Sequence, residues 1–308
     1  MSRPLRRIAS DEPAGPGYSI APPAAGREAV LTAGVSVEPG TDYGFFTDST
    51  VCIGCKACEV ACKEWNQIPM DEFGFKDTSY DNTGQLLATT WRHVDFIEES
   101  PRDGRPGRWL FLSDVCKHCE RAGCLEACPT GAIVRTEFGS VLIQQDVCNG
   151  CRYCVPSCPF GVITLAEGQD GMAHKCTLCY DRLKAGLEPA CAKACPTDSI
   201  LFGALPGLRG TARRRLRELH ARGMREAYLY GAPGTPGATG GIGSLNCFFL
   251  LTERPEAYNL PAAPELPSRR VLPALLSTAA AGAFWGAATA LIIWRARRVP
   301  SQAGGGRP

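Results

Sequence analysis

The amino-acid sequence predicts an α+β fold followed by a single C-terminal transmembrane helix. Three observations support this prediction. The chain has 308 residues and 17 cysteines, and all of these cysteines except Cys247 lie between Cys52 and Cys195. They form groups whose spacing repeats along the chain. One stretch, residues 271–294, is apolar and long enough to cross a bilayer as a helix.

Composition excludes several classes of protein. A net charge of +2 with 21% charged residues argues against a nucleic-acid-binding surface, and 44% hydrophobic residues argue against global disorder. A polytopic membrane protein is excluded because only one stretch is apolar enough to span. The cysteine content exceeds that of ordinary cytosolic enzymes, yet the chain is too long for a small disulfide-stapled scaffold.

The N-terminal residues 1–40 are rich in Ala, Pro and Gly and are predicted to form a disordered tail. An early cluster of arginines is followed by Asp11, Glu12 and Pro13 rather than by an apolar run. We therefore expect no signal peptide here.

Two segments follow this tail. The cysteine-rich body is predicted to span residues 41–205. An extension over residues 206–268 contains an amphipathic helix at 211–224, a glycine-rich loop at 231–243 and a buried strand at Cys247–Leu251. The loop lacks the spacing of a nucleotide site, so it is interpreted as a flexible connector.

The C-terminal apolar stretch is the predicted membrane anchor. Residues 271–294 carry no charge, and a helix of that length covers about 36 Å, against about 30 Å for the hydrocarbon core. A buried core helix, the alternative, would be shorter and carry a polar face. Arg269 and Arg270 precede the span, while more arginines lie in a basic tail at residues 295–308. The positive-inside rule therefore predicts a cytoplasmic C-terminus. The span contains no His or Met to ligate a haem.

The cysteines other than Cys247 form four groups of four. In chain order the groups are Cys52, Cys55, Cys58 and Cys62; Cys116, Cys119, Cys124 and Cys128; Cys148, Cys151, Cys154 and Cys158; and Cys176, Cys179, Cys191 and Cys195. The first and third groups have the spacing C-x2-C-x2-C-x3-C, which is the bacterial ferredoxin pattern. In that pattern three thiolates of a tight loop hold one cluster and the fourth reaches a neighbouring cluster. The cysteine count matches four [4Fe–4S] clusters.

Disulfides and zinc are the competing interpretations. Disulfides would require an oxidising compartment, and the C-x2-C-x2-C crowding is poor disulfide geometry. Structural zinc usually takes two C-x2-C pairs, and the fourth group alone fits such a site, but the triplets do not. A metal-storage or structural zinc protein remains the alternative class of function. Cys247 lies in the apolar run Cys247–Leu251 and is predicted to be a buried apolar cysteine rather than a ligand.

No catalytic centre is predicted in this chain. The four histidines are isolated in sequence, without a motif for a nucleophile or a metal-bound water; they are His93, His118, His174 and His220. His118 and His174 lie near cysteine groups, where they could tune cluster potentials through hydrogen bonds, but surface or packing roles are the favoured expectation. Lys175 directly precedes Cys176 and is the candidate for electrostatic tuning between clusters.

Three strings carry a family resemblance: CIGCKACEVACKEWN at residues 52–66, KCTLCYDR at 175–182 and EPAC at 188–191. They resemble the iron–sulfur (beta) subunit of respiratory, membrane-bound formate dehydrogenase. The resemblance runs from about residue 46 to the end of the predicted transmembrane helix, and the N-terminal tail lies outside it. The four cysteine groups are shared with the wider four-cluster electron-transfer subunits of molybdopterin oxidoreductases. The single C-terminal helix and the Lys-Glu-Trp-Asn string favour the formate branch.

The resemblance implies two bacterial-ferredoxin-like dicluster modules, one inserted in the other. Spacing alone leaves the pairing of the groups open. Carried over from the family, the implied ligand sets are Cys52, Cys55, Cys58 and Cys195 (first set); Cys62, Cys176, Cys179 and Cys191 (second set); Cys116, Cys119, Cys124 and Cys158 (third set); and Cys128, Cys148, Cys151 and Cys154 (fourth set).

The resemblance also implies a function in respiration. A molybdopterin catalytic subunit, with Mo or W, oxidises formate and passes electrons through the four [4Fe–4S] clusters to a haem-b membrane subunit and quinone. The iron–sulfur body is then expected on the outer face of the cytoplasmic membrane, having crossed folded with a partner that bears a twin-arginine signal. The alternative is the equivalent subunit of a hydrogenase or of a sulfoxide- or polysulfide-type reductase.

Overall fold

The computed structural model describes residues 37–69, 80–81, 83–101, 107–166, 168 and 170–298. The predicted disordered tail at 1–40 therefore falls almost entirely outside the described residues, as does most of the predicted basic tail at 295–308. The residues described here belong to one compact unit, Ser36–Pro308.

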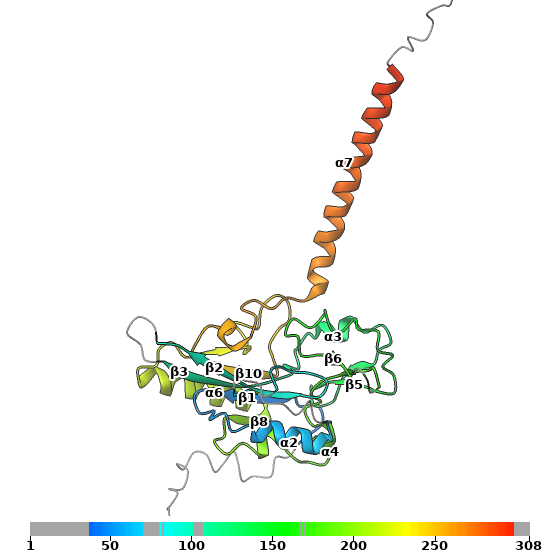
Figure 1. Ribbon diagram of the computed structural model, residues 1–308. Coiled ribbons are helices and arrows are strands. Elements are labelled where there is room, and N and C mark those ends of the chain that lie inside the picture. The colour runs from blue at the N-terminus through cyan, green and yellow to red at the C-terminus, as the bar shows by residue number, and fades with distance from the viewer. Residues whose placement is uncertain are drawn as a thin grey trace, which may run out of the picture. The chain divides into compact units, whose positions relative to one another are not determined.

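A four-stranded mixed sheet joins the two ends of the body (Figure 1). Its strand order is β8-β1-β10-β9, with β1 at Tyr43–Asp48, β8 at Ile200–Ala204, β9 at Tyr228–Tyr230 and β10 at Cys247–Leu251. Strand β1 pairs with β10 in parallel and with β8 in antiparallel orientation. The predicted buried strand is confirmed with the same bounds, and every residue of β10 is buried. A continuous apolar run is what a strand covered on both faces requires.

Helix α6 (Leu205–Ala221) packs against β1 and β8. Its buried residues Leu205, Leu208, Ala212 and Leu219 recur at the helical period and form one apolar face. The prediction of a helix at 211–224 was wrong in its bounds, because the helix starts earlier, with a proline in its first turn. Glycines near that start, each disfavoured by about 1 kcal/mol, obscured the helical pattern, but burial of Leu205 and Leu208 outweighs them.

The strands β2 (Arg92–Glu99) and β3 (Arg108–Val115) form a long antiparallel pair. Arg92 is paired with Val115 at one end, and Glu99 with Arg108 at the other. Leu112 of β3 is fully buried and belongs to the main hydrophobic core, so the pair is fixed against the sheet.

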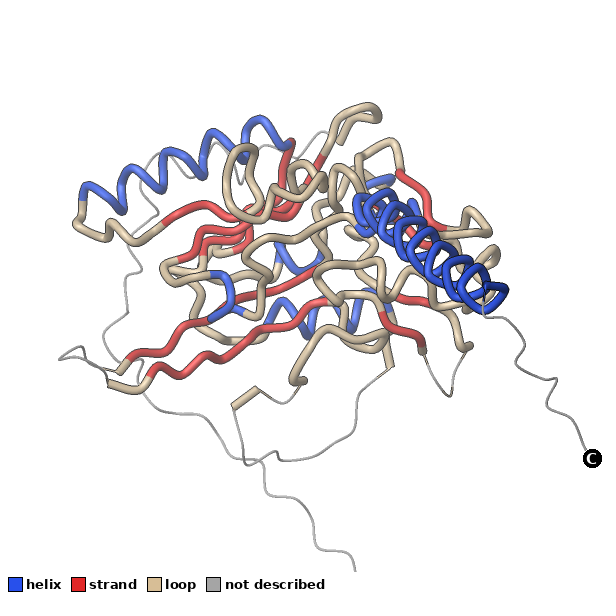
Figure 2. The backbone as a smooth tube through the Cα atoms, turned by 90° about the horizontal axis from the view of Figure 1, so that it is seen from above, coloured by secondary structure: helices blue, strands red, loops and turns tan. Residues whose placement is uncertain are grey.

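Short elements carry the cysteine loops, and Figure 2 shows that loops connect them over much of the body. They are α2 (Ala57–Asn66), α3 (Gly123–Glu126), α4 (Tyr180–Lys184), α5 (Ala190–Lys193), β4 (Ile133–Arg135), β5 (Val141–Ile143), β6 (Thr164–Leu165) and β7 (Ala173–His174). The strands pair as β4 with β5 and β6 with β7, both antiparallel. Because these elements are short, the cysteine loops between them can bring several thiols toward one centre.

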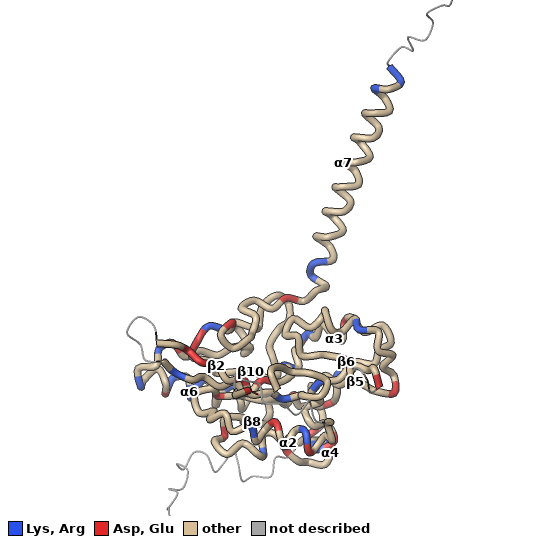
Figure 3. The backbone as a smooth tube through the Cα atoms, viewed as in Figure 1, with Lys and Arg blue, Asp and Glu red and all other residues tan. Residues whose placement is uncertain are grey.

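The C-terminal segment begins with two 3-10 turns, η1 (Pro255–Tyr258) and η2 (Pro267–Arg270), and continues as α7 (Val271–Arg298). The span Pro267–Arg298 is long and apolar enough to cross a membrane, with a mean hydropathy of 1.6 in its most apolar window. In Figure 3 the Lys and Arg colour appears at the far end of α7 and in η2 just before it, with none along the helix between. The helix predicted at 271–294 is thus present, and none of its described side chains is buried.

Candidate metal centres

The fold brings the first cysteine triplet to the last cysteine of the body. A small cavity is lined by Cys52, Cys55, Cys58 and Cys195. The triplet loop turns through Gly54 and Lys56, both in the left-handed backbone region. A Cβ on Gly54 would lie 2.8 Å from the Phe111 ring, so only glycine fits this approach.

A second small cavity is lined by Cys128, Cys148, Cys151 and Cys154. Its loop turns through Gly150, where an added Cβ would lie 2.6 Å from the carbonyl oxygen of Gly171. Ala132, Ile133 and Ile143 complete the wall with apolar side chains that exclude water. The third cysteine group therefore gives three thiols to this cavity, and the second group gives the fourth.

The remaining ligand candidates form two further spatial sets. Burial raises the pKa of Cys62, and the nearby charges of Cys191 and Cys179 raise it further. Burial raises the pKa of Cys176 well above its ordinary value, and the charges of Cys62, Cys116, Cys179 and Cys191 raise it further, so Cys176 lies near cysteines of both the second and the third implied sets. Helices α2 and α5, which pack together, carry two of these cysteines.

The other set surrounds Cys119. Burial raises its pKa well above the ordinary value, followed by the charges of Cys116, Cys158 and Cys124. Two of the four ligand sets that the resemblance implies line common cavities, and the ligand assignment as a whole stays a prediction.

Charge interactions between cysteines link each implied set to the next. Burial raises the pKa of Cys58 to about 12, and Cys191 of the second set contributes. Cys116 of the third set likewise acts on Cys176, and Cys154 of the fourth acts on Cys124. Cys55 in the first set and Cys151 in the fourth are the exposed cysteines, so both ends of the series reach the surface.

This donor set fits iron–sulfur clusters. All 17 cysteines are unpaired in the structure. Crowded, buried thiolates repel one another, and burial raises their pKa, so they ionise only with a cationic centre between them. Backbone and side-chain donors point at several sulfurs: Leu178 N lies 3.3 Å from Cys176 Sγ, and Thr130 Oγ1 lies 3.6 Å from Cys128 Sγ. Such donors orient and tune cluster ligands.

The predicted tuning residue Lys175 is buried between the second and third sets. Its Nζ donates to the carbonyl oxygens of Val141 and Cys176. Burial alone would lower the pKa of Lys175, but the charges of Cys116 and Cys124 outweigh burial and raise it. The lysine is therefore held as a cation beside both sets.

Two other buried cations, Lys117 and Arg92, were not predicted from the sequence. The Lys117 side chain is fully buried; its Nζ pairs with Asp114 and donates to the carbonyl oxygen of Val115 at 2.9 Å. Its position between Cys116 and Cys119 was a signal that could have identified it. Arg92 is 1% exposed and lies far from any cysteine in sequence, so nothing in the local pattern marked it.

His118 and His174 differ in environment. His118 is buried, and its Nδ1 accepts a hydrogen bond from the backbone N–H of Val141 at 2.9 Å. Burial, followed by the charge of Lys175, holds the pKa of His118 well below its usual range, so the ring is neutral and carries its proton on Nε2. His174 is half-buried and pairs with Asp170 at 2.8 Å.

His93 belongs to a buried ion-pair network that sequence spacing did not reveal. Its Nε2 lies 2.9 Å from both Asp81 and Asp95, and its Nδ1 lies 2.6 Å from Thr83 Oγ1. The ligand atoms of His93 and the two aspartates lie within 4.8 Å of one another, as in a metal site. Lys56 Nζ also reaches Asp81 at 3.0 Å, so protein cations already balance these carboxylates.

This network predicts a pH-dependent stability. Burial would lower the pKa of His93, but hydrogen bonds to Asp81 and Asp95 outweigh burial and raise it to about 9. The resulting stabilisation, at most about 3 kcal/mol, is fully present below His93's unfolded pKa and is lost as pH rises through about 9. We expect the Tm of the full chain to fall over this range, and to fall less in His93→Gln. The half-buried His174→Gln is the control, and equal slopes in all three proteins would contradict the assignment.

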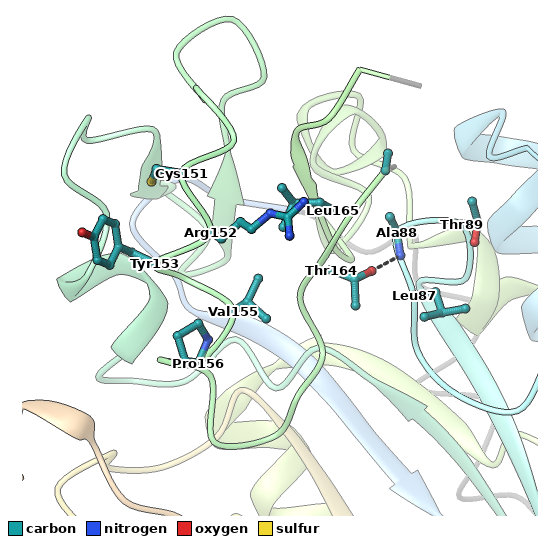
Figure 4. A pocket seen from close by; sticks show the side chains of 11 residues that line it. Leu87, Ala88, Thr89, Cys151, Arg152, Tyr153, Val155, Pro156, Thr164 and Leu165 are labelled. Atoms are coloured by element: carbon teal, nitrogen blue, oxygen red, sulfur yellow. Dashed lines mark hydrogen bonds between the residues drawn. The ribbon is translucent and has the colours of Figure 1, made fainter. Parts of the chain in front are cut away.

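A surface pocket adjoins the fourth set. Figure 4 shows Cys151, Arg152 and Tyr153 on one side of it, and Leu87 and Ala88 on the other. The backbone N–H of Ala88 donates to Thr164 Oγ1 across its floor. The pocket lining is mostly apolar, and Tyr153 is 63% exposed.

Four cysteine sets of this kind, on short loops within an α+β body, define a ferredoxin-like electron-transfer protein. Two family models, both described as 4Fe-4S dicluster domains, match residues 51–132 and 107–205. The predicted double ferredoxin-like fold is thereby confirmed.

Comparison with individual proteins identifies the family within this class of electron-transfer proteins. The chain is 41% identical to the iron–sulfur subunit of the nitrate-inducible formate dehydrogenase of Escherichia coli, over 71% of this chain and 72% of the relative. It is 40% identical to the formate dehydrogenase iron–sulfur subunit of Haemophilus influenzae, over 71% and 68%. The B subunit of the anaerobic dimethyl sulfoxide reductase of E. coli is 36% identical, over 55% of this chain and 77% of that subunit. The chain belongs to the family of formate dehydrogenase iron–sulfur subunits, and the resemblance inferred from the sequence is confirmed.

Proposed function

We propose that this chain conducts electrons through four [4Fe–4S] clusters, from a molybdopterin subunit (Mo or W) that oxidises formate to a haem-b membrane subunit that reduces quinone. The observation that carries the proposal is the series of four cysteine sets with an exposed cysteine at each end. Membership of the formate dehydrogenase iron–sulfur family supports formate as the substrate of the catalytic partner.

Each set would hold one cluster, with the four ligand sets defined by the resemblance. A bound [4Fe–4S] cluster accepts and returns one electron with little rearrangement. The protein's own residues fix the positions, exclude water and supply hydrogen bonds. At Cys128, for example, hydrogen bonds from Thr130 and nearby backbone outweigh burial and lower the pKa, which stabilises the thiolate as a ligand.

The place where α7 begins supports a direction for the series. Leu266, just before η2, is fully buried, and Ser268 of η2 donates to Glu126 of α3 at 2.8 Å. Helix α3 carries Cys124 of the third set. The third and fourth sets are therefore the membrane-proximal ones in the proposal, and the catalytic subunit docks near Cys55 of the first set.

The arginine distribution around α7 supports a sidedness. The C-terminus is proposed to be cytoplasmic, with the iron–sulfur body on the outer face of the membrane.

In the alternative function, a dimethyl sulfoxide reductase-type complex or a hydrogenase uses the protein in the same role. The match to the dimethyl sulfoxide reductase subunit covers 55% of this chain, against 71% for the formate dehydrogenase subunit, which favours the formate complex. Co-purification and identification of the largest partner distinguishes the two.

Cluster content tests the proposal directly. Anaerobically prepared protein is expected to contain about sixteen irons and about sixteen acid-labile sulfides per chain, four of each in every cluster. The control is Cys247→Ala, which should keep the full content because Cys247 is a buried residue of β10 outside the four sets. Stoichiometric zinc with little sulfide would show that the sites are not iron–sulfur centres.

A further inference from the structure

Arg92 is a buried cation without a carboxylate partner among the described residues. It is 1% exposed, and its guanidinium carbon lies 4.7 Å from the centre of the Phe45 ring. Nη1 donates to Ser113 Oγ at 3.0 Å, while Nε and Nη2 have no hydrogen-bond partner in the part of the chain that the structure describes. A buried charge left without an opposite charge is strongly unfavourable. Arg92 therefore requires a negative charge close by, and no carboxylate among the described residues supplies one.

The negative groups around Arg92 are cysteines of two sets. Burial lowers the pKa of Arg92, but the charges of Cys191, Cys58 and Cys176 outweigh burial and raise it. Cys58 belongs to the first set, and Cys191 and Cys176 to the second. The guanidinium thus lies at the junction between these two sets, and two of its nitrogens, Nε and Nη2, have no partner among the described residues.

Ser113 connects Arg92 to one particular sulfur. Its Oγ lies 3.3 Å from Cys58 Sγ. Because Arg92 Nη1 already donates to this oxygen, the hydroxyl proton is free to be donated to the sulfur. The β2–β3 ladder holds both residues, with Arg92 opposite Val115 and Ser113 opposite Val94, so their separation is fixed by the register.

We propose that Arg92 compensates charge at the junction of the first and second clusters and raises the reduction potentials of both. Each reduction adds one electron, and a nearby buried cation favours the more negative, reduced form. Ser113 extends the effect to the first cluster alone, through its hydrogen bond to Cys58. An arginine suits this position because it keeps its charge when buried and presents several donors. The inference rests on the proposed assignment of the cluster ligands.

Redox titration followed by paramagnetic resonance tests the role of Arg92 in the anaerobically purified complex. In Arg92→Gln the midpoint potentials of the first and second clusters should fall, and those of the third and fourth should stay unchanged. Arg92→Lys should give smaller shifts, since it keeps the charge but not the forked donors. The matched control is Arg108→Gln, which removes an arginine at the opposite end of the same ladder, where Arg108 pairs with Glu99. No potential should move in that control.

Ser113→Ala removes the hydrogen bond to Cys58 but leaves the buried charge of Arg92 in place. It should lower the potential of the first cluster and leave the second unchanged. If Arg92→Gln fails to assemble clusters, the midpoint potentials of Arg92→Lys and Ser113→Ala test the inference in its place. Wild-type potentials in both of them, or equal shifts of all four clusters in Arg92→Gln, would overturn the inference. Iron and sulfide analysis of the wild-type protein tests the cluster assignment separately. A failure of that assignment can therefore be distinguished from a failure of the role proposed for Arg92.

Discussion

A Cys195→Ser variant is expected to lose or alter the cluster of the first set, although Cys195 belongs to the last cysteine group in the sequence. The reason lies in the sheet. Strand β1 runs into the first cysteine loop, and β8 follows Cys195, while the two strands pair with Thr47 opposite Ile200. Two hydrogen bonds of 2.8 Å between Asp48 and Ser199 extend this pairing toward the cysteines. Cys195 is thereby held against the cavity that Cys52, Cys55 and Cys58 line.

The measurement is paramagnetic resonance together with iron and sulfide content. Loss of one cluster removes about four of about sixteen irons, and the signals of the other three should remain. Cys247→Ala controls for removal of a cysteine as such and should keep every signal. Signals of the first-set cluster that are unchanged in Cys195→Ser would show that the ligand sets are paired differently.

Truncation before Leu272 is expected to release the iron–sulfur body from the membrane, or to remove its association with the haem subunit, with cluster absorbance intact. Helix α7 contributes no buried side chain among the residues described, and the main hydrophobic core includes none of its residues. Its apolar side chains are exposed, so transfer from water to lipid is the main stabilisation available to them. Deletion of α7 should therefore abolish membrane anchoring without preventing the iron–sulfur body from folding.

Membrane fractionation and visible absorbance measure this outcome. A chain shortened only after Arg298 is the control and should stay membrane-bound. A truncated chain that still sediments with membranes in the absence of its partners, or that has lost its iron, would refute the anchor as a separate element. Protease added to intact spheroplasts then reports the side: digestion of the body with an intact C-terminal tail supports an outer location, and the reverse pattern places the body in the cytoplasm.

The local geometry of the cysteine loops, the apolar C-terminal helix and the buried strand could all be predicted from the amino-acid sequence. In a C-x2-C-x2-C loop the three thiols are only a few residues apart, so the spacing nearly fixes their relative positions. The strand Cys247–Leu251 and the uncharged span at 271–294 depend likewise on residues that are contiguous in the chain. Local information is sufficient wherever the interacting residues are near one another in sequence.

The folded structure was needed to show which distant cysteines line the two cysteine cavities and which cations lie near the cysteines. Cys195 reaches the first cavity because β1 and β8 pair, and the spacing of its own group points equally well to a self-contained site. Arg92 looks like an ordinary polar residue at the start of a strand, and His93 like an isolated histidine. Their burial and their partners come from segments far along the chain. A charge buried without a local partner is stable only when the whole fold brings opposite charge to it, so no local pattern predicts its position.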